Sequence, residues 1–316
     1  MTYLFDEFYC YIGHRNPQWR NNRLIKMLRV ITRLKANLIL PLWYRLTASR
    51  SSNRLTTDFE QRQSPRLIVS LTSFPARIPK LWLVIESLLR QTHKPDAIIL
   101  WLSRDQFPGG LADLPRSLTR LQQRGLRIEF REGDIRSHKK YCYCQKEYPD
   151  DIMVTADDDI FYSPRILERL WKVHEQHPQA IATNHAHQMK FTADGILEPY
   201  TQWNFNSEAE QHLFFIGAGT NLFPPHALHP DVCDIEAARA TCPQGDDIWL
   251  NAMAHLAGTP IIHTSQRGFT GLPVMNRDNT TLWSGNIGPS NGNDQQIKAL
   301  RSYFVTHYGH EPFLAS

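Results

Sequence analysis

Residues 152–160 read Ile-Met-Val-Thr-Ala-Asp-Asp-Asp-Ile, an apolar run that stops at three adjacent carboxylates at positions 157–159. The run predicts a buried strand over 152–156. Adjacent carboxylates repel one another, and a hard divalent cation such as Mg2+ or Mn2+ relieves that repulsion because it prefers oxygen ligands. The alternative is an acidic turn before the helix expected from Ser163-Pro164, since Asp favours turns and N-caps. A strand before the triplet and a helix after it favour a functional site.

The composition indicates a globular chain of one large or two small domains. Of its 316 residues, 41% are hydrophobic and 11% aromatic, which suffices for a substantial core. The five cysteines are odd in number and lack zinc-ribbon spacing, so we predict free thiols in a reducing compartment. They are Cys10, Cys142, Cys144, Cys233 and Cys242. Residues 5–8 are acidic and aromatic, unlike a signal peptide, so a cytoplasmic location is expected.

The first 57 residues carry most of the positive charge. The whole chain has a formal net charge of +4, but ten Lys or Arg lie between positions 15 and 54 with no Asp or Glu among them. With Asp6 and Glu7 included, residues 1–57 carry +8, which leaves −4 for the remainder. Such a segment is suited to an anionic surface.

The basic segment also has the pattern of an amphipathic helix, because apolar residues recur at helical spacing and basic residues fall largely opposite them. The apolar positions are Leu24, Leu28, Ile31 and Leu38, and the basic ones are Arg23, Lys26, Arg29 and Arg33. The longest uncharged run, 36–44, has nine residues, far short of the roughly 20 that span a bilayer. We expect this helix to lie on an anionic membrane surface. Packing on the rest of the protein and binding a protein partner are the alternatives.

A polar stretch over 51–65 separates the basic segment from the rest of the chain. We therefore predict an N-terminal arm over 1–63 and one α/β domain over 64–316. The expected strands are 67–71, 97–102, 126–130, 152–156, 180–184 and 260–263, and the expected helices are 80–91, 164–177 and 246–257. This alternation predicts a sheet flanked by helices, with ligands at the carboxyl ends of the strands, where Thr72, Ser73 and the Asp triplet lie.

Four segments resemble one known family. The opening Leu-Ile-Val-Ser-Leu-Thr-Ser-Phe-Pro-Ala-Arg-Ile at 67–78 resembles the nucleotide-sugar half of GT-A glycosyltransferases, particularly family 2-like enzymes, and the triplet at 157–159 matches their DXD motif. Phe-Ile-Gly-Ala-Gly-Thr at 215–220 resembles the glycine loop near the acceptor. Gln-Gly-Asp-Asp-Ile-Trp at 244–249 resembles the acidic pair that opens the helix of the catalytic base. The resemblance covers roughly residues 66–265 and implies a GT-A mixed sheet.

The resemblance and the residue types together imply roles for individual side chains. The nucleotide-sugar group is Thr72, Ser73, Arg77, Lys140, Asp157 and Asp158; the metal group is Asp159, Asp157 and His263; the acceptor loop is Gly217, Ala218 and Gly219. Asp246 or Asp247 is the expected catalytic base, with Asp247 favoured by its place in the motif. An acceptor hydroxyl needs such a base because its own pKa is far above 7.

Several of these residues have simpler interpretations. The pair at 246 and 247 can act as helix N-caps, and Arg77, Lys139 and Lys140 can be solvated surface charges. The two glycines need no ligand to explain them, and His263 can be a structural histidine. His185 and His187 alternate on one strand face and can line an acceptor cleft.

The function expected from the sequence is an inverting glycosyltransferase that depends on Mn2+ or Mg2+. It would move a sugar from a nucleotide-sugar donor to a glycan or lipid-linked acceptor in bacterial surface-polysaccharide synthesis, at the cytoplasmic face of a membrane. No nucleic-acid partner is expected. The alternatives are a metal-dependent phosphoryl-transfer or hydrolytic enzyme, and a catalytically silent carbohydrate-binding scaffold of the same fold.

Overall fold

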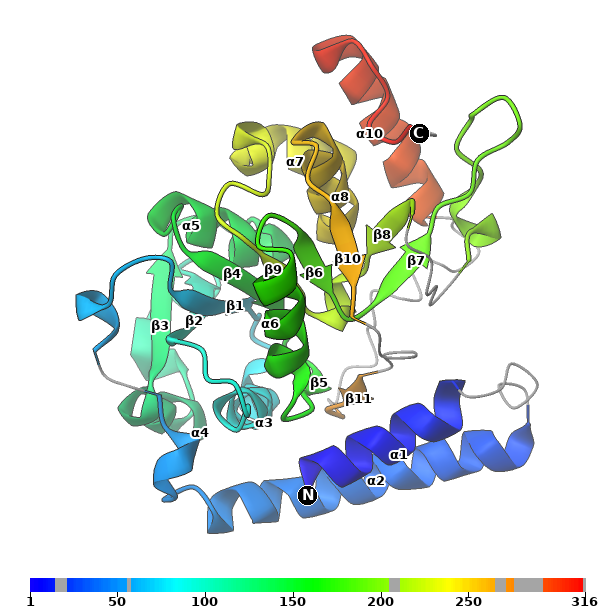
Figure 1. Cartoon of the computed structure of the whole chain (residues 1–316). Helices are drawn as coiled ribbons and strands as arrows, with labels where there is room; N and C mark the ends of the chain where they lie inside the picture. Colours follow the sequence, from blue (N-terminus) through cyan, green and yellow to red (C-terminus); the bar gives the residue numbers. More distant parts are fainter. Residues whose placement is uncertain (15–21, 56–57, 205–210, 265–270, 276–291, 315–316) are drawn as a thin grey trace.

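A seven-stranded sheet forms the centre of the protein (Figure 1). The computed structural model describes residues 1–14, 22–55, 58–204, 211–264, 271–275 and 292–314. The strand order is β3-β2-β1-β4-β9-β6-β10, and only β9 runs antiparallel to its neighbours. In chain order the strands are β1 (Leu67–Thr72), β2 (Ala97–Ser103), β3 (Leu126–Arg131), β4 (Ile152–Ala156), β6 (Ile181–Thr183), β9 (Asn221–Phe223) and β10 (Ile261–His263).

Helices cover both faces of the sheet, which explains why its strands are apolar almost throughout. Alternate residues of β2 belong to opposite sides of the sheet. Ile98 and Leu100 join one core with α3 (Ile78–Leu89), whereas Ile99 and Trp101 join a second core with α5 (Lys139–Glu147) and α8 (Asp246–Leu256). The helices of the body are α3 (Ile78–Leu89), α4 (Arg116–Thr119), α5 (Lys139–Glu147), α6 (Ile166–Gln176), α7 (Ile235–Thr241), α8 (Asp246–Leu256) and α10 (Gly292–Tyr308). The GT-A-like class predicted from the sequence is confirmed by this arrangement.

The expected elements occur with ends shifted by one or two residues, but several others carry no clear sequence signal. The central strand β9 has only three residues and follows the turn Gly217–Gly219 directly. Short pairs form β5 (Ile160–Phe161) with β11 (Leu272–Pro273) and β7 (Ala186–Gln188) with β8 (Leu213–Phe215). Three-residue strands are too short to show a period, so only tertiary pairing defines them.

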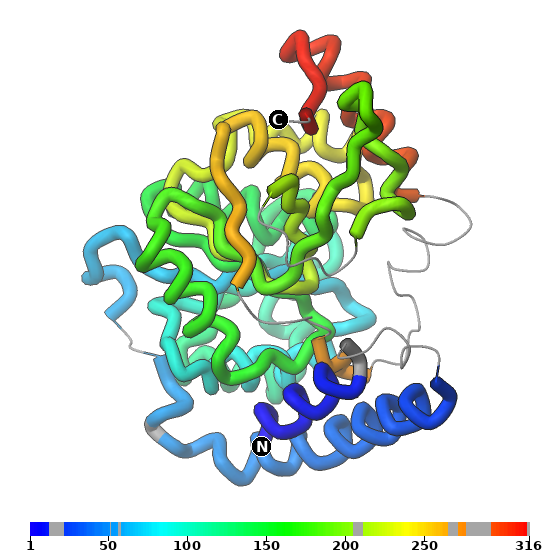
Figure 2. Tube along the Cα trace, turned by 45° about the vertical axis from the view of Figure 1, so that its right-hand side comes forward, coloured from blue at the N-terminus to red at the C-terminus, as the bar shows by residue number. Residues whose placement is uncertain are grey.

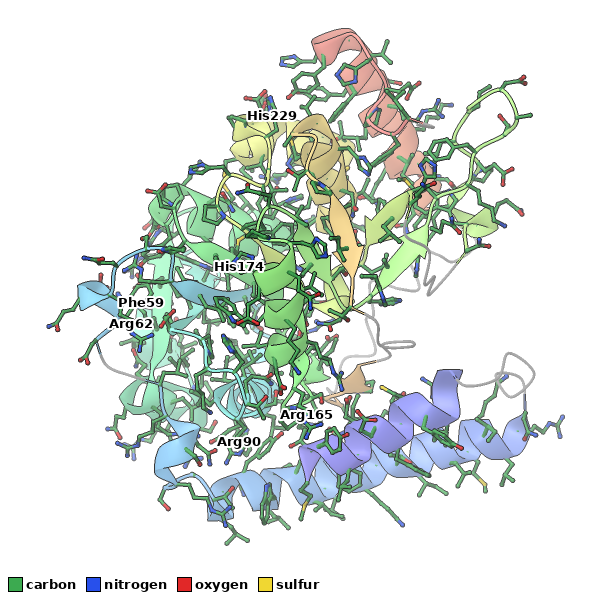
Figure 3. The ribbon with its side chains drawn as sticks, in the orientation of Figure 1. Phe59, Arg62, Arg90, Arg165, His174 and His229 are labelled. Carbon is green, nitrogen blue, oxygen red and sulfur yellow. The ribbon has the colours of Figure 1, made fainter. Side chains whose placement is uncertain are left out.

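The N-terminal segment forms a helical hairpin of α1 (Thr2–His14) and α2 (Arg23–Leu46), which lies across one end of the body (Figures 1 and 2). The two helices run antiparallel: the Thr2 hydroxyl lies 2.9 Å from the Tyr44 hydroxyl, and the Arg29 guanidinium lies 4.7 Å from the Tyr9 ring centre. Arg165, next to α6, reaches α1 by stacking 5.2 Å over Tyr3 (Figure 3).

The inner side of α2 packs on the body. Its buried residues are Thr32, Ala36, Leu40 and Tyr44, and the last three belong to the same core as α3. One of the alternatives stated for this helix, packing on the rest of the protein, is therefore realised. The division of the chain at residue 63 stays a prediction.

The orientation of α2 differs from the usual arrangement of an amphipathic helix. Leu24, Ile31 and Leu38 are exposed on its outer side, whereas Arg29 and Arg33 are half-buried, Arg29 against Tyr9 of α1. Leu28, the fourth of the predicted apolar positions, is half-buried. The apolar row thus faces away from the core.

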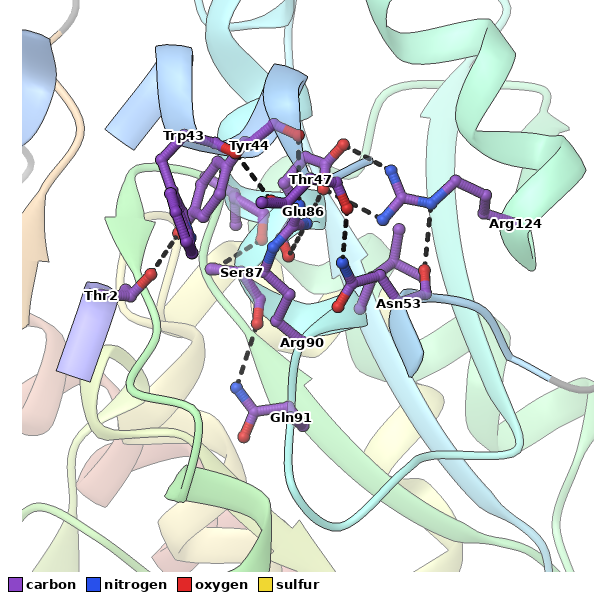
Figure 4. A network of polar contacts seen from close by, with 12 residues as sticks. Thr2, Trp43, Tyr44, Thr47, Asn53, Glu86, Ser87, Arg90, Gln91 and Arg124 are labelled. Atoms are coloured by element: carbon purple, nitrogen blue, oxygen red, sulfur yellow. Dashed lines mark hydrogen bonds and ion pairs between the residues drawn. The ribbon is translucent and has the colours of Figure 1, made fainter. Parts of the chain in front are cut away.

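A buried carboxylate fastens the hairpin to α3 (Figure 4). Glu86 is fully buried between Arg90 and Arg124, with 2.6 Å from Arg124 Nη1 to its Oε1. Arg90 also donates to the Tyr44 carbonyl at 3.2 Å and to the Thr47 hydroxyl at 3.0 Å. Removing one member would leave charge uncompensated in the interior, so the network holds the end of α2 in place.

Two negative findings concern the described residues alone. No helix within them combines the length and the apolar character needed to cross a bilayer. All five cysteines lie in the described ranges, and none forms a disulfide, as the sequence predicts.

Candidate functional site

Lys140 on α5 joins two of the motifs found in the sequence. Its ammonium lies 2.9 Å from Asp157 Oδ1, after β4, and 2.8 Å from Asp246 Oδ2, at the start of α8. Lys140 is buried; burial alone would lower its pKa, but Asp157 and Asp246 outweigh that effect and hold the pKa well above its usual range. The side chain therefore stays cationic between two carboxylates.

The main chain of Lys140 is held by the sheet below it. Ser70 of β1 donates its hydroxyl to the Lys140 carbonyl, and Trp101 of β2 donates its indole N–H to Ser70 Oγ at 2.8 Å. The interpretation of Lys140 as a solvated surface charge is wrong, because two acidic motifs enclose it. It is wrong also for Lys139, which is buried and paired with Asp134.

The three carboxylates after β4 have different surroundings. Asp158 is only 7% exposed and accepts hydrogen bonds from Ser73 Oγ at 2.6 Å and from the Arg77 guanidinium. Asp157 and Asp159 are 27% and 32% exposed. Asp158 therefore ties the turn to the end of β1, and its two neighbours present the accessible oxygens.

The charges of the triplet are incompletely compensated. Burial raises the pKa of Asp159 to about 6; Arg77, 3.0 Å away, lowers it, and the carboxylates of Asp157 and Asp158 raise it further. Burial likewise raises the pKa of Asp158 against the opposing effect of Arg77. An added cation would stabilise this turn.

The turn is also fixed through its main chain. Tyr162, fully buried, accepts the Asp157 N–H at 2.6 Å and donates to the Asp157 carbonyl at 3.2 Å. The Val274 N–H donates to the Asp159 carbonyl at 2.7 Å. Asn37 of α2 donates to the Pro273 carbonyl at 2.9 Å and accepts from the Met275 N–H at 2.8 Å. The hairpin thus supports the segment that holds Asp159.

The exposed carboxylates fit a hard divalent cation. In the described part of the chain, no three His, Cys, Asp or Glu side chains converge closely enough to hold an ion by themselves. Mg2+ in particular is commonly bound by one or two carboxylates, with waters and substrate phosphates completing the shell. Asp157 and Asp159 offer such a pair at one turn, so the donor set fits an ion shared with a phosphate ligand.

Two other predicted residues, Thr72 and His263, lie at this edge of the sheet. His263 ends β10, and β6 and β9 lie between β10 and β4, so their backbones are about 14 Å apart at roughly 4.8 Å per strand. Thr72 donates its hydroxyl to the Trp101 carbonyl at 2.7 Å and so stabilises the pair β1–β2. The metal role of His263 and the donor role of Thr72 stay predictions.

Asp246 and Asp247 open α8. The N-cap position itself is Gly245, but Asp247 Oδ1 accepts the Ile248 N–H at 3.0 Å, so part of the capping interpretation is realised in the first turn of the helix. Lys140 lowers the pKa of Asp246 against the opposing effect of burial. Burial and the charge of Asp246 raise the pKa of Asp247 to about 7. The two neighbours therefore differ, with Asp246 ionised and Asp247 able to exchange a proton near neutral pH.

The glycine turn meets Asp247. Against the burial that raises the pKa of Asp247, the Gly217 backbone N–H lowers it, and a Cβ on Gly217 would lie 3.7 Å from Lys140 Nζ. Asn251 donates to the Asp247 carbonyl and the Phe215 carbonyl, both at 2.8 Å, which ties α8 to β8. The turn that includes Ala218 is thereby placed beside the carboxyl group that can act as a base.

Gly219 has a structural explanation. A Cβ there would lie 2.2 Å from His185 Cβ and 2.9 Å from the His185 nitrogen, closer than packed atoms can approach. We expect Gly219→Ala to lower the free energy of unfolding by about 1–3 kcal/mol, as overpacking does. Gly217→Ala, with an ordinary 3.7 Å contact, is the matched control and should change stability much less. Denaturant unfolding of both variants measures this, and equal stability would contradict the close approach.

His185, which contacts Gly219, lies beside His187. The rings of His185 and His187 are 5.2 Å apart, and His187 lies 5.9 Å from the Tyr200 ring. Burial lowers the pKa of His187 to about 4, so its ring is neutral near pH 7. Their place in an acceptor cleft stays a prediction.

Sequence reasoning missed several residues that shape the site. Tyr162, Ser70, Trp101 and Asn251 act through hydrogen bonds to main-chain atoms or to another side chain. Only one signal was present: Tyr162 and Asn251 follow the two acidic motifs at short spacing. Nothing in a one-dimensional pattern indicates which carbonyl a side chain will meet.

The fold is thus of the GT-A-like α/β class, with a carboxylate turn, a buried lysine and a second carboxylate pair at its centre. No protein family matches the chain, and no curated protein matches it. It is similar to a solved mannosyltransferase from Pyrobaculum calidifontis, in complex with GDP-Man and Mn2+, at 13% identity over 85% of this chain and 73% of that one, with a TM-score of 0.49.

Two further solved structures are similar to the chain at a comparable sequence identity. They are a putative glucose-1-phosphate thymidylyltransferase from Bacillus anthracis (13% identity, 72% of this chain and 94% of that one, TM-score 0.39) and a 4-diphosphocytidyl-2C-methyl-D-erythritol synthase (14%, 65% and 92%, 0.39). With TM-scores below 0.5, these similarities assign no function. Any proposal about function therefore rests on the geometry of the site.

Proposed function

We propose that the protein is a metal-dependent, inverting glycosyltransferase that uses a nucleotide-sugar donor. The observation that carries the proposal is the Lys140 bridge, which holds an accessible carboxylate turn and a carboxyl group of pKa about 7 in one site. A cation-binding turn and a base are the two groups that sugar transfer from a diphosphate requires. A glycan or lipid-linked acceptor, as in bacterial surface-polysaccharide synthesis, is the proposed partner.

The donor diphosphate would bind at Asp157 and Asp159. Mn2+ or Mg2+ held by these two carboxylates would neutralise the charge that develops on the leaving diphosphate. Arg77, paired with both Asp158 and Asp159, supplies a fixed positive charge at the same turn. Asp158 keeps this turn in place through Ser73.

Asp247 would act on the acceptor. Its carboxylate takes the hydroxyl proton as the acceptor oxygen attacks the anomeric carbon, and the bond from that carbon to the diphosphate oxygen breaks. The sugar is transferred in a single displacement, so its anomeric configuration inverts. The neighbouring Asp246 keeps Asp247 a better base by raising its pKa.

The proposal is tested by donor binding. Thermal-shift measurements with UDP-, GDP-, dTDP- and CMP-sugars, each with Mn2+, should stabilise the protein with one group of donors, because a ligand at 100 times its Kd adds about 2.7 kcal/mol. Isotope-labelled donor and candidate acceptors then report transfer. Stabilisation by simple phosphoesters and by no sugar nucleotide would support a phosphoryl-transfer or hydrolytic enzyme instead. Binding of glycans without donor binding would support a silent scaffold.

Asp159→Asn should weaken Mn2+-dependent donor binding by about ten- to a hundredfold, the equivalent of one charged contact of about 1.5–3 kcal/mol. Folding should be unaffected or slightly improved, because the change relieves repulsion within the triplet. Calorimetric titration of donor with and without Mn2+ measures this. Asp194→Asn, an exposed Asp outside the site, is the control. Unchanged affinity in Asp159→Asn would remove this residue from the metal site.

A further inference from the structure

The outer side of α2 carries a continuous row of exposed apolar side chains. The outer apolar row consists of Leu24, Met27, Ile31, Leu34, Leu38 and Leu42, which are between 36% and 70% exposed. Their spacing of three or four residues places them along one side of the helix. In α1, Leu4, Phe8 and Tyr11 are exposed at the same spacing. Extended apolar surface of this kind marks an interaction site.

A basic hollow lies at the end of the outer apolar row. It has a volume of about 630 Å³ and is lined by Arg45, Arg116, Ser117, Thr119, Arg120 and Gln123. Within the part of the chain that the structure describes, no ion pair involves any of its three arginines. Leu42 and Leu46, both exposed, lie next to Arg45 on the last turns of α2. The Arg45 guanidinium lies 5.3 Å over the Trp82 ring, and apolar surface adjoins positive charge that, among the described residues, has no carboxylate partner.

We propose that the hairpin docks on an anionic lipid bilayer, with the outer apolar row at the acyl boundary and a headgroup phosphate between Arg45, Arg116 and Arg120. This inference rests on the hairpin and the adjoining α4 segment and does not depend on the proposed catalytic activity. An in-plane amphipathic helix with basic residues around its apolar side has the properties of a membrane-surface helix. Arginine suits phosphate because its planar guanidinium can donate two parallel hydrogen bonds.

Charge distinguishes the bilayer from other occupants. Helix α2 contains no Asp or Glu, and its exposed basic residues are Arg23, Lys26, Lys35 and Arg45, so this surface complements an anionic leaflet. Two copies joined through this side would bring like charges together, which opposes such a dimer. The inner side of α2 is already packed on the body, so the outer apolar row is left for a partner.

Docking at this side has a consequence for the carboxylate turn. Asn37 of α2 holds Pro273 and Met275, and the intervening Val274 holds the Asp159 carbonyl. The turn is therefore fixed relative to the docked helix, which suits an acceptor that is anchored in the same bilayer.

The test uses the full chain with vesicles of phosphatidylcholine alone or mixed with phosphatidylglycerol. Flotation should show binding to the anionic vesicles, weakened by salt because screening shortens the range of the attraction. Leu34→Glu combined with Leu38→Glu should reduce vesicle affinity by at least about tenfold, since two apolar side chains no longer enter the interface. Val305→Glu, at a 50% exposed position of α10, is the matched control and should bind as the unchanged protein does.

The basic hollow is tested separately. Arg116→Gln with Arg120→Gln should reduce affinity for anionic vesicles by about thirtyfold, the equivalent of roughly 2 kcal/mol for two basic residues. Arg239→Gln with Lys298→Gln removes the same charge from α7 and α10, on the far side from the hairpin, and should have little effect (Figure 1).

Three results would overturn the inference: no binding of the full chain to either vesicle, equal loss in the two charge variants, or a dimer that the Leu34 and Leu38 changes dissociate without any vesicle binding.

Discussion

Asp247→Asn is expected to lose roughly 10²–10⁴-fold in turnover while it binds the donor normally. The amide keeps the size of the carboxyl group and an oxygen that can accept the Ile248 N–H, but it cannot take a proton from the acceptor. Because Asp247 is not expected to contact the diphosphate, the loss should fall on kcat and leave donor affinity unchanged. Donor titration and steady-state turnover on a verified acceptor measure the two quantities.

Asp246→Asn tests the role of Asp247 through the neighbouring charge. Without the Asp246 charge, the pKa of Asp247 should fall below about 7, and the acidic limb of the pH–rate profile should move to lower pH. The unchanged protein should show a rate that rises with pH through about 7. If Asp247→Asn retains full turnover, or if the acidic limb does not respond to Asp246→Asn, the base lies elsewhere.

The free energy of unfolding should fall as the pH rises, whereas the rate of turnover should rise. The pKa of Asp247 is about 7 in the folded protein and about 3.9 in an unfolded chain. Between these values the folded state binds the proton and the unfolded state does not, so this group lowers stability as the pH rises from about 4 to about 7. Asp247→Asn should therefore melt higher than the unchanged protein at pH 8, and the difference should shrink toward pH 4. A difference independent of pH would contradict the raised pKa.

Lys140→Met is expected to destabilise the protein by about 3–5 kcal/mol, the cost of removing one member of a buried ion pair. Asp157 and Asp246 would then face each other without the ammonium that now separates them at 2.9 and 2.8 Å. Lys140→Arg should not restore the site fully, because a planar guanidinium cannot take the place of a compact ammonium held between two carboxylates. Lys140→Met should also raise the pKa of Asp247 further, since the Lys140 charge lowers it.

Urea unfolding at pH 7 measures the loss. Lys146→Met, an exposed lysine on the same helix, is the control and should change stability little. Combining Lys140→Met with Asp246→Asn removes one uncompensated charge and should recover part of the stability. If Lys140→Met proves as stable as the control, the bridge contributes nothing; if the double variant is less stable than the single one, Asp246 has another partner.

The sequence predicted the fold well because buried strands and amphipathic helices have short periods. The runs at 67–72, 97–103 and 152–156 are apolar throughout, as strands covered on both faces must be. It could not predict β9, whose three residues show no period, nor its antiparallel direction between β4 and β6. The pairing of β9 is decided by the space that its neighbours leave.

For the site, the sequence alone indicated the acidic candidate residues. The triplet at 157–159 and the pair at 246–247 are visible as acidic groups at the ends of apolar segments, since strand ends and helix starts meet at one edge of an α/β sheet. It also determined the charge and the helical character of α2. Those properties depend on composition and spacing, which a linear chain displays fully.

Only the tertiary structure decided which of these acidic groups stays ionised and which side of α2 is exposed. Lys140 has no special sequence neighbours, yet α5 buries it between two carboxylates, and that contact separates Asp246, which stays ionised, from Asp247, whose pKa rises to about 7. Likewise, the core that takes Ala36, Leu40 and Tyr44 turns the apolar row of α2 outward. Burial and charge compensation depend on distances between residues far apart in the chain, and those distances exist only once the chain has folded.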